Sequence, residues 1–255
     1  MKIFLCIDDT DSIESRGTGE LAEIIANSIE KLNWGKAGMV TRHQLLLHKD
    51  IPYTSHNSSM CFEAEIEEKQ LENLIKYASE FLEKESEPKS DPGLCVVSMD
   101  FLIDSRKLIE FGYKTKKTIL TKEEAYKLAK ELNIHLSEHG GSGQGVIGAL
   151  AGAGLRLSGN DGWFKGSNKL NPSNNIIKVS ELCSYSNIDA VKDINGKYLE
   201  DKEEVILGKM VKSMLIDGKA VILVDKAKED SNIKWKVCGK RQLMDYEEMK
   251  LNVAE

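Results

Sequence analysis

The stretch that organises this chain is Ile3-Phe-Leu-Cys-Ile-Asp-Asp-Thr-Asp-Ser12, in which a short apolar run ends in three carboxylates within four residues. The β-branched and aromatic run Lys2–Ile7 predicts a buried strand, because it is too short for a helix and polar turn residues follow it at once. Carboxylates this close repel one another, and a bound divalent cation or a raised pKa relieves the repulsion. We therefore expect a metal-and-phosphate site at the end of a central strand.

The predicted metal ligands are Asp8, Asp9 and Asp11, and we expect the neighbouring Thr10 and Ser12 to contact nucleotide phosphate. Mg²⁺ is bound through a few carboxylate oxygens, while water and substrate phosphates complete its octahedron. The alternative is structural, because aspartate and serine side chains also accept hydrogen bonds from nearby backbone amides in turns.

A helix is predicted from about Gly19 to Leu32, because its apolar residues recur at helical spacing. Gly35 lies where a left-handed C-terminal cap would fit. At the start of the helix, the Thr18 hydroxyl and the backbone of Gly17 and Gly19 suit a phosphate that faces the acids. Thr18 also suits the role of an N-cap, and the two roles are compatible.

A second glycine-rich loop, His139-Gly-Gly-Ser-Gly-Gln-Gly145, precedes a predicted helix of small residues. Glycine lets the backbone approach a phosphate closely, and the start of the following helix favours an anion. The loop matches neither the Walker pattern nor a full GxGxxG after a strand, and tight helix packing is an alternative reason for several of the glycines. The residues assigned to a nucleotide cradle here are Gly141, Ser142, Gly143 and Gly145.

The rest of the chain alternates predicted strands and helices. Thr121 and Glu124 stand in a capping-box relation at the start of one helix. The basic segment Lys107–Thr118 gives no clear element, although Phe111-Gly-Tyr113 suggests a turn. Strands are expected within 37–48 and at 60–66, 94–99 and 134–136, and helices at 68–84 and 121–132.

The composition changes after about Gly166, and the remaining segment predicts a small β-rich lobe. Asp217-Gly218 between two apolar runs is a strong hairpin signal. Strands are expected at 176–179, 205–207, 209–216, 220–224 and 234–238.

Bulk properties narrow the class of protein. With 255 residues and 41% hydrophobic residues, the chain can build a sizeable core. The five cysteines are scattered and form no CxxC pair, which argues against a disulfide framework and a zinc ribbon. No window has the apolar length that spans a bilayer and Met1 leads straight into a strand, so we expect a cytoplasmic protein. The net charge of -6 gives no global attraction for nucleic acid, though a local basic patch is compatible with it.

The order of these motifs resembles the archaeal agmatidine synthetase family, which modifies the wobble cytidine of an isoleucine tRNA. The resemblance covers roughly Met1 to Gly154 and the family's kinase-like and ferredoxin-like domains. It rests on Ile7–Ser12, on Thr18 at the same offset, and then on Leu47–Asn57, Asp91-Pro-Gly93 and Gly143–Leu150.

The resemblance implies an α/β (α+β) fold. A kinase-like, ATP-binding region would occupy residues 1–58 and 119–168, with a ferredoxin-like region at 59–118. The β-rich C-terminal lobe would occupy residues 169–255.

The family uses ATP and Mg²⁺ to phosphorylate the cytosine carbonyl oxygen and then displaces the phosphate with agmatine. The resemblance implies that Asp8, Asp9 and Asp11 bind metal and phosphate and that Thr18 is a catalytic hydroxyl. Such chemistry depends chiefly on positioning and charge neutralisation. Substrate contact is assigned to Arg42, His56 and Asn57, which lie in or near one strand and loop.

The sequence also departs from the family. Its Cys-Thr-Thr is here Gly17-Thr18-Gly19, and its Thr-Arg-Gly-Asn is closest to Ser55-His-Asn57. The cysteines of a zinc ribbon are missing, as is room for the tRNA-binding OB fold. We predict that the activating half is kept and that the segment from Asn171 onward replaces the recognition half. The acceptor is then a small molecule or a nucleotide rather than a full tRNA.

The sequence therefore predicts an ATP- and Mg²⁺-dependent phosphotransferase or ligase. A haloacid-dehalogenase-like phosphatase ranks behind, because Asp9-Thr-Asp-Ser-Ile13 approaches DxDx[T/V] but fails at Ile13. The non-enzymatic alternative is a nucleotide sensor or an RNA-binding module. An aromatic content of 6% and the negative net charge count against an RNA-stacking surface.

Overall fold

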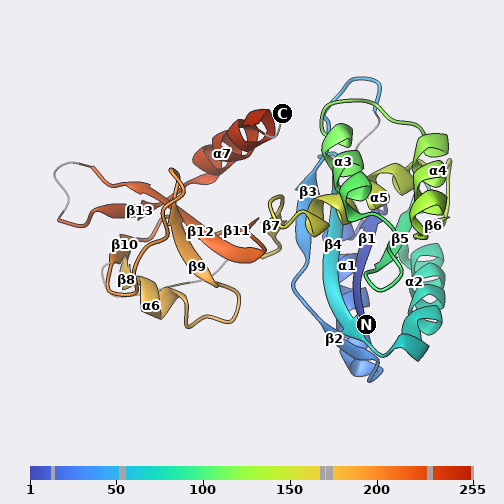
Figure 1. The fold of residues 1–255 in the computed structure, drawn as a ribbon, viewed down its shortest axis with the longest axis horizontal. Helices are drawn as coiled ribbons and strands as arrows, with labels where there is room; N and C mark the ends of the chain where they lie inside the picture. The colour runs from blue at the N-terminus through green and yellow to red at the C-terminus, as the bar shows by residue number, and fades with distance from the viewer. Residues whose placement is uncertain (13–14, 52–55, 167–169, 171–174, 229–231, 254–255) are drawn as a thin grey trace. The chain divides into compact units, whose positions relative to one another are not determined.

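The computed structural model describes residues 1–12, 15–51, 56–166, 170, 175–228 and 232–253. The chain forms two compact units, Met1–Ser158 (unit 1) and Gly159–Glu255 (unit 2), whose elements are labelled in Figure 1. The mixed α/β class predicted from the sequence is confirmed. Unit 2 begins before the predicted start of the C-terminal lobe at residue 169. The predicted kinase-like and ferredoxin-like regions both fall mainly in unit 1, and their boundary stays a prediction.

Unit 1 is built on an antiparallel sheet with the strand order β6-β5-β1-β4-β3, and β2 also pairs with β4. β1 lies between β4 and β5, so that Cys6 is opposite both Cys61 and Cys95. The predicted central position of the first strand is therefore confirmed. The strands are β1 Lys2–Asp8, β2 Gly35–Ala37, β3 Thr41–Gln44, β4 Ser58–Ile66, β5 Gly93–Ser98 and β6 His135–Glu138.

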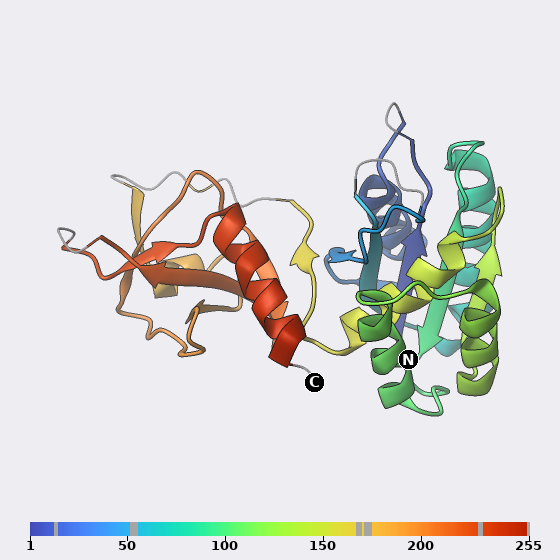
Figure 2. The same ribbon diagram turned by 90° about the horizontal axis from the view of Figure 1, so that it is seen from above.

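Helices cover both faces of this sheet. Alternate residues of β1 point to opposite faces: Ile3, Leu5 and Ile7 join the core beneath α1 and α2, while Phe4 and Cys6 join the core beneath α3, α4 and α5. Figure 2 shows α1 and α2 on one side of the strands and α3 and α4 on the other. The helices are α1 Thr18–Lys31, α2 Leu71–Glu85, α3 Ser105–Thr115, α4 Lys122–Leu132 and α5 Gly145–Leu157, and a short 3₁₀ helix, η1 Glu68–Gln70, precedes α2.

Two local predictions were wrong. Asn33, rather than Gly35, takes the left-handed conformation after α1, with a φ of 55°. The segment read as a turn around Gly112 is part of α3, which Asp104 caps by accepting from the amides of Arg106 and Lys107. Gly112 is tolerated in that helix because a Cβ there would lie 2.9 Å from the carbonyl oxygen of Ala151 in α5.

The capping box of α4 is confirmed. The Thr121 side chain accepts from the Glu124 amide, and the Glu124 side chain accepts from the Thr121 amide. This fixes where α4 begins, and so also where Lys122 and Tyr126 lie on its first turns.

Unit 2 is a small β-rich unit around the long strand β12, which pairs with β11 and β13 antiparallel and with β9 parallel. The predicted hairpin between β11 and β12 is confirmed, because Asp217 and Gly218 both have positive φ, of 52° and 73°. The sequence reading missed β9 and α7. The elements are β7 Trp163–Phe164, β8 Ile176–Lys178, α6 Val179–Leu182, β9 Ala190–Asp193, β10 Glu204–Ile206, β11 Ser213–Ile216, β12 Lys219–Lys226, β13 Trp235–Val237 and α7 Lys240–Val253. Among the residues described above, no helix is long and apolar enough to cross a membrane.

Candidate functional site

Asp8 is the last residue of β1 and lies where several backbone segments of unit 1 meet. It pairs with Gly93 at the start of β5, and its residue surface is only 8% exposed. A Cβ placed on Gly148, in the first turn of α5, would overlap the Asp8 carboxylate. The carboxylate therefore packs directly against the start of α5, and Gly148 provides the space for it.

Burial and like charges act together on the first two aspartates. Burial raises the pKa of Asp8 well above its ordinary value, and the charges of Asp9 and Asp11 raise it further. Burial, Asp91 and Asp11 raise the pKa of Asp9 to about 6. A bound cation would relieve this repulsion, so the electrostatics of the cluster suit a divalent ion.

Asp11 has a structural role that the sequence left open. Its Oδ2 accepts a hydrogen bond from the backbone amide of Thr18 at 3.0 Å, which satisfies one of the free amides at the start of α1. Gly17 is the N-cap residue, and Thr18 is the first residue of the helix and is buried. The structural alternative for Asp11 therefore holds, and the predicted N-cap role of Thr18 was wrong.

Thr10 lies between these acids and is 1% exposed. Within the described residues its Oγ1 has no hydrogen-bond partner, although its carbonyl oxygen accepts from the amide of Glu87 at 3.0 Å. A buried hydroxyl without a partner is costly unless a ligand or an ion completes it. Ser12, at the end of the motif, donates its amide to Oγ of Ser15 at 2.7 Å.

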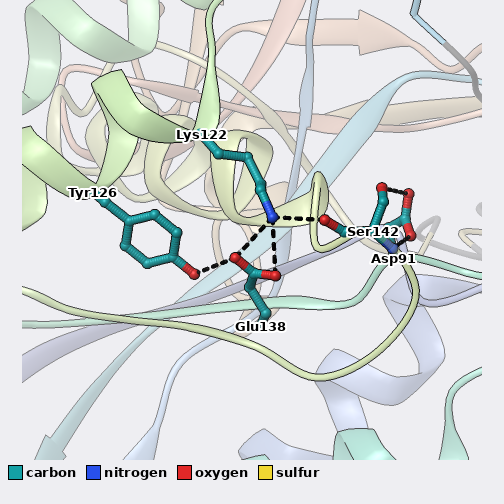
Figure 3. Close-up of polar contacts among 5 residues, drawn as sticks. All are labelled: Asp91, Lys122, Tyr126, Glu138 and Ser142. Carbon is teal, nitrogen blue, oxygen red and sulfur yellow. Dashed lines mark hydrogen bonds and ion pairs between the residues drawn. The ribbon is translucent and has the colours of Figure 1, made fainter.

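The glycine loop before α5 is held by two carboxylates on opposite sides (Figure 3). Asp91 accepts hydrogen bonds from both the amide and the hydroxyl of Ser142, the latter at 2.7 Å. Lys122 donates to the carbonyl oxygen of Ser142 at 2.6 Å and to both oxygens of Glu138 at 2.9 and 3.0 Å. Tyr126 also donates to Glu138, at 2.8 Å.

These contacts give a reason for the glycines of the loop other than the phosphate binding that the sequence predicted. Gly141 has a φ of 54°, and a Cβ there would overlap the Asp91 carboxylate. Gly143 has a φ of 74°, and a Cβ there would overlap the Glu138 carboxylate. The glycines thus make room for protein carboxylates as well as allowing left-handed backbone.

Part of the predicted phosphate cradle is already occupied by protein groups. The Gly145 amide donates to the carbonyl oxygen of Asp91 at 3.0 Å, and the Ser142 amide also donates to Asp91. Across the described residues, the amides of Gly143 and Gln144 have no hydrogen-bond partner. These two amides lie at the start of α5, where an anion is favoured.

The residues assigned to a substrate lie on β3 and the loop before β4. Arg42 donates to Oγ of Ser58 at 3.0 Å and to Oε1 of Gln44 at 2.8 Å. Asn57 donates to the carbonyl oxygen of Leu46 at 2.8 Å, and His56 is exposed. Arg42 therefore contacts neighbouring side chains and Asn57 supports the local backbone, and the contact of both with a substrate stays a prediction. Residues 52–55 of the resembling run, and Ile13 of the phosphatase-like motif, lie outside the described residues.

Sequence reasoning missed four residues of this region: Asp91, Lys122, Tyr126 and Glu138. Asp91-Pro-Gly93 belonged to the resembling motifs but was given no role. Its charge raises the pKa of Asp9, so Asp91 belongs to the acid cluster. Lys122, Tyr126 and Glu138 carried no motif that pointed to the loop.

The three predicted metal ligands do not form a ready-made cage. Throughout the described ranges, no group of three or more His, Cys, Asp or Glu side chains is arranged to hold a metal ion. Mg²⁺ does not require such a cage, because it commonly binds through one or two carboxylates together with water and substrate phosphates.

Several solved structures are similar to this chain. The chain is similar to the apo form of TiaS, the agmatidine synthetase of an isoleucine tRNA, at 28% identity and a TM-score of 0.51, over 60% of this chain and 35% of that one. The mixed α/β fold of this chain is therefore TiaS-like over the part that the match covers. A tRNA fluorescent labeling enzyme is similar at 29% identity and a TM-score of 0.53, over 60% of this chain and 36% of that one. A scan of protein-family models and a search of curated proteins give no match.

A third similarity reaches further along the chain. The complex of TiaS with its tRNA and ATP matches 79% of this chain and 50% of that one, at 22% identity and a TM-score of 0.54. That share is more than unit 1 contains, so part of unit 2 takes part in the match. At this identity the likeness concerns the fold alone. The chain spans between about a third and a half of the length of these TiaS structures.

Proposed function

We propose that this protein is an ATP- and Mg²⁺-dependent phosphotransferase or ligase related to TiaS. The observation that carries the proposal is the packing of the buried Asp8 carboxylate, whose pKa burial and the neighbouring aspartates raise, against the start of α5. A site that concentrates negative charge next to a helix start suits a nucleotide whose phosphates arrive with a metal ion. The likeness to the agmatidine synthetase TiaS at 28% identity supports a related chemistry.

The donor set fits Mg²⁺. All the candidate groups are oxygens, namely the carboxylates of Asp8, Asp9 and Asp91 and the unpartnered hydroxyl of Thr10, and Mg²⁺ prefers oxygen ligands. We assign Asp8 and Asp9 as the principal ligands, because Asp11 already accepts from the Thr18 amide. When bound, the ion would neutralise charge on the transferred phosphate.

The phosphate chain would lie along the start of α5. The amides of Gly143 and Gln144 are the donors proposed for it, and the Thr18 hydroxyl at the start of α1 is the proposed catalytic group. Positioning and charge neutralisation supply most of the rate in phosphoryl transfer, so the protein needs few covalent participants.

For the acceptor we propose a small molecule or a free nucleotide, because the net charge of -6 gives no general attraction for the backbone of a long nucleic acid. A nucleotide within an RNA is the second candidate. It is favoured by one observation, that the similar structures at 28% and 29% identity are those of a tRNA agmatidine synthetase and a tRNA fluorescent labeling enzyme.

The test is calorimetric titration of the full chain with ATP, with and without Mg²⁺, followed by chromatographic analysis of the products. Mg²⁺-dependent binding is expected, and the product distinguishes the mechanisms: AMP favours two-step TiaS-like chemistry, and ADP favours a simple kinase. Binding without turnover, in the presence of amines, nucleotides and tRNA in turn, would make the protein a sensor. Absence of ATP binding would refute the proposal.

A further inference from the structure

We propose that Asp91, Lys122 and Glu138 are positioning residues that hold the glycine loop 139–145 in its binding shape before any ligand arrives. The proposal deepens the proposed function, since it concerns the same site and rests on that function for its effect on ATP. Figure 3 shows the three side chains around Ser142.

The first clamp is Asp91, which holds the loop at two residues. Its carboxylate accepts from the amide and the hydroxyl of Ser142, and its backbone carbonyl accepts from the amide of Gly145. The same carboxylate occupies the space beside Gly141 that a side chain would need. A Cβ at Gly145 would overlap the Asp91 carbonyl oxygen and lie 2.9 Å from the Asp8 carbonyl oxygen, so the end of the loop also packs against the end of β1.

The second clamp is the pair Lys122–Glu138. Lys122 comes from the first turn of α4 and Glu138 from the end of β6, and both contact the loop. Lys122 and the Tyr126 hydroxyl together lower the pKa of Glu138, which favours its ionised carboxylate. Lys122 then holds the Ser142 carbonyl oxygen, while the Glu138 carboxylate fills the space beside Gly143.

The start of the loop is anchored separately by His139. Its side chain is 5% exposed; Nε2 lies 2.8 Å from Oγ of Ser137, and Nδ1 lies 3.3 Å from Oε1 of Glu83 on α2. The His139 amide donates to the carbonyl oxygen of Pro92 at 2.9 Å. Because the loop is held at both ends and in the middle, the amides of Gly143 and Gln144 keep one orientation. Binding of a ligand therefore carries no entropic cost of ordering the loop.

The decisive variant is Lys122→Met, which removes the second clamp and leaves every acidic residue in place. The matched control is Lys127→Met, at an exposed position of the same helix. We expect hydrogen exchange of amides 140–145 to speed up at least about tenfold in the nucleotide-free Lys122→Met protein and to stay unchanged in the control. We also expect ATP binding to weaken about tenfold, as is typical when a supporting residue behind a binding site is removed.

Two further variants separate positioning from general stability. Lys122→Arg keeps a cation that can reach Glu138, so it should restore most of the ATP affinity lost in Lys122→Met. Ser142→Ala removes one hydrogen bond to Asp91 and should raise loop exchange without lowering the melting temperature by more than about a degree or two.

Exchange of the loop at the wild-type rate in Lys122→Met would overturn the proposal, as would faster exchange with undiminished ATP affinity. If the wild-type protein binds no ATP, the proposed function fails, whereas the exchange measurement still decides whether the clamps hold the loop.

Discussion

Two carboxylates of unit 1, Asp8 and Glu138, each occupy the space that a side chain on a nearby glycine would need. Their electrostatic settings are opposite. Lys122 and Tyr126 lower the pKa of Glu138, whereas burial and neighbouring aspartates raise that of Asp8. Side chains of the protein itself thus stabilise the charge of Glu138. Among the described residues, no cation lowers the pKa of Asp8 in the same way. A buried carboxylate whose pKa is raised by burial and by neighbouring acids is the better candidate for a ligand site.

The largest expected effect follows from removing the uncompensated charge. Asp8→Ala should lower ATP turnover at least about a hundredfold, because a proposed ligand of the Mg²⁺ that neutralises charge on the transferred phosphate is lost. The fold should survive with an unchanged or higher melting temperature, since burying a repelled carboxylate is costly. Steady-state kinetics and thermal unfolding provide the measurement.

The control for that variant is Asp100→Ala, which changes an exposed aspartate of the same unit. Glu138→Ala completes the comparison. It should instead destabilise the protein by about 1 kcal/mol, because Lys122 loses its partner. Full activity of Asp8→Ala would show that the acid cluster is not part of the catalytic site.

The next effect concerns the space beside Asp8. Gly148→Ala should destabilise unit 1 by about 2 kcal/mol, since the new Cβ would overlap the buried Asp8 carboxylate and lie 3.0 Å from a methyl carbon of Leu45. Denaturant unfolding measures the loss. In an Asp8→Ala background the same substitution should cost much less, because the overlapping atoms are gone. Equal costs in both backgrounds would show that Gly148 does not serve Asp8.

A smaller effect depends on pH. The folded protein holds the Asp9 proton more tightly than the unfolded chain, so stability should fall as pH rises from about 4 to about 6. Asp9→Asn keeps a residue suited to the φ of 51° and removes this loss. Without metal, the variant should be more stable than the wild type by about 1 kcal/mol at pH 7.5 and equal to it below pH 4. Melting curves of both proteins across this range measure the difference, and a difference in stability that stays constant from pH 4 to pH 7.5 would contradict the prediction.

The smallest effect lies in unit 2, where a carboxylate is compensated. Asp217 accepts from Lys192 at 2.7 Å and Tyr198 at 2.8 Å, and these contacts lower its pKa. Asp217→Asn retains the left-handed turn and should cost about 1 kcal/mol or less. Thermal unfolding and ATP titration test it together, and a more than twofold change in ATP affinity would mean that unit 2 contributes to the site.

Local patterns were sufficient for much of unit 1. The strand that ends at Asp8, the helix after Thr18 and the capping box at Thr121 all depend on neighbouring residues, and each was predicted near its observed place. α3 was missed because Gly112 is a poor helix former, and only its close approach to α5 explains its presence. α7 was missed because few of its side chains are buried, Leu243 and Tyr246 among them, which gives a weak pattern.

By itself the sequence determined that three aspartates follow a buried strand and that a glycine loop precedes a helix. Only the tertiary structure decided which residues those features contact. Asp8 packs against Gly148, Asp91 holds Ser142, and Glu138 with Lys122 closes around the same loop. Most of these contacts join residues far apart in the chain, so no local pattern encodes them. They arise because the antiparallel pairing of β1, β5 and β6 brings the ends of those strands to the start of α5.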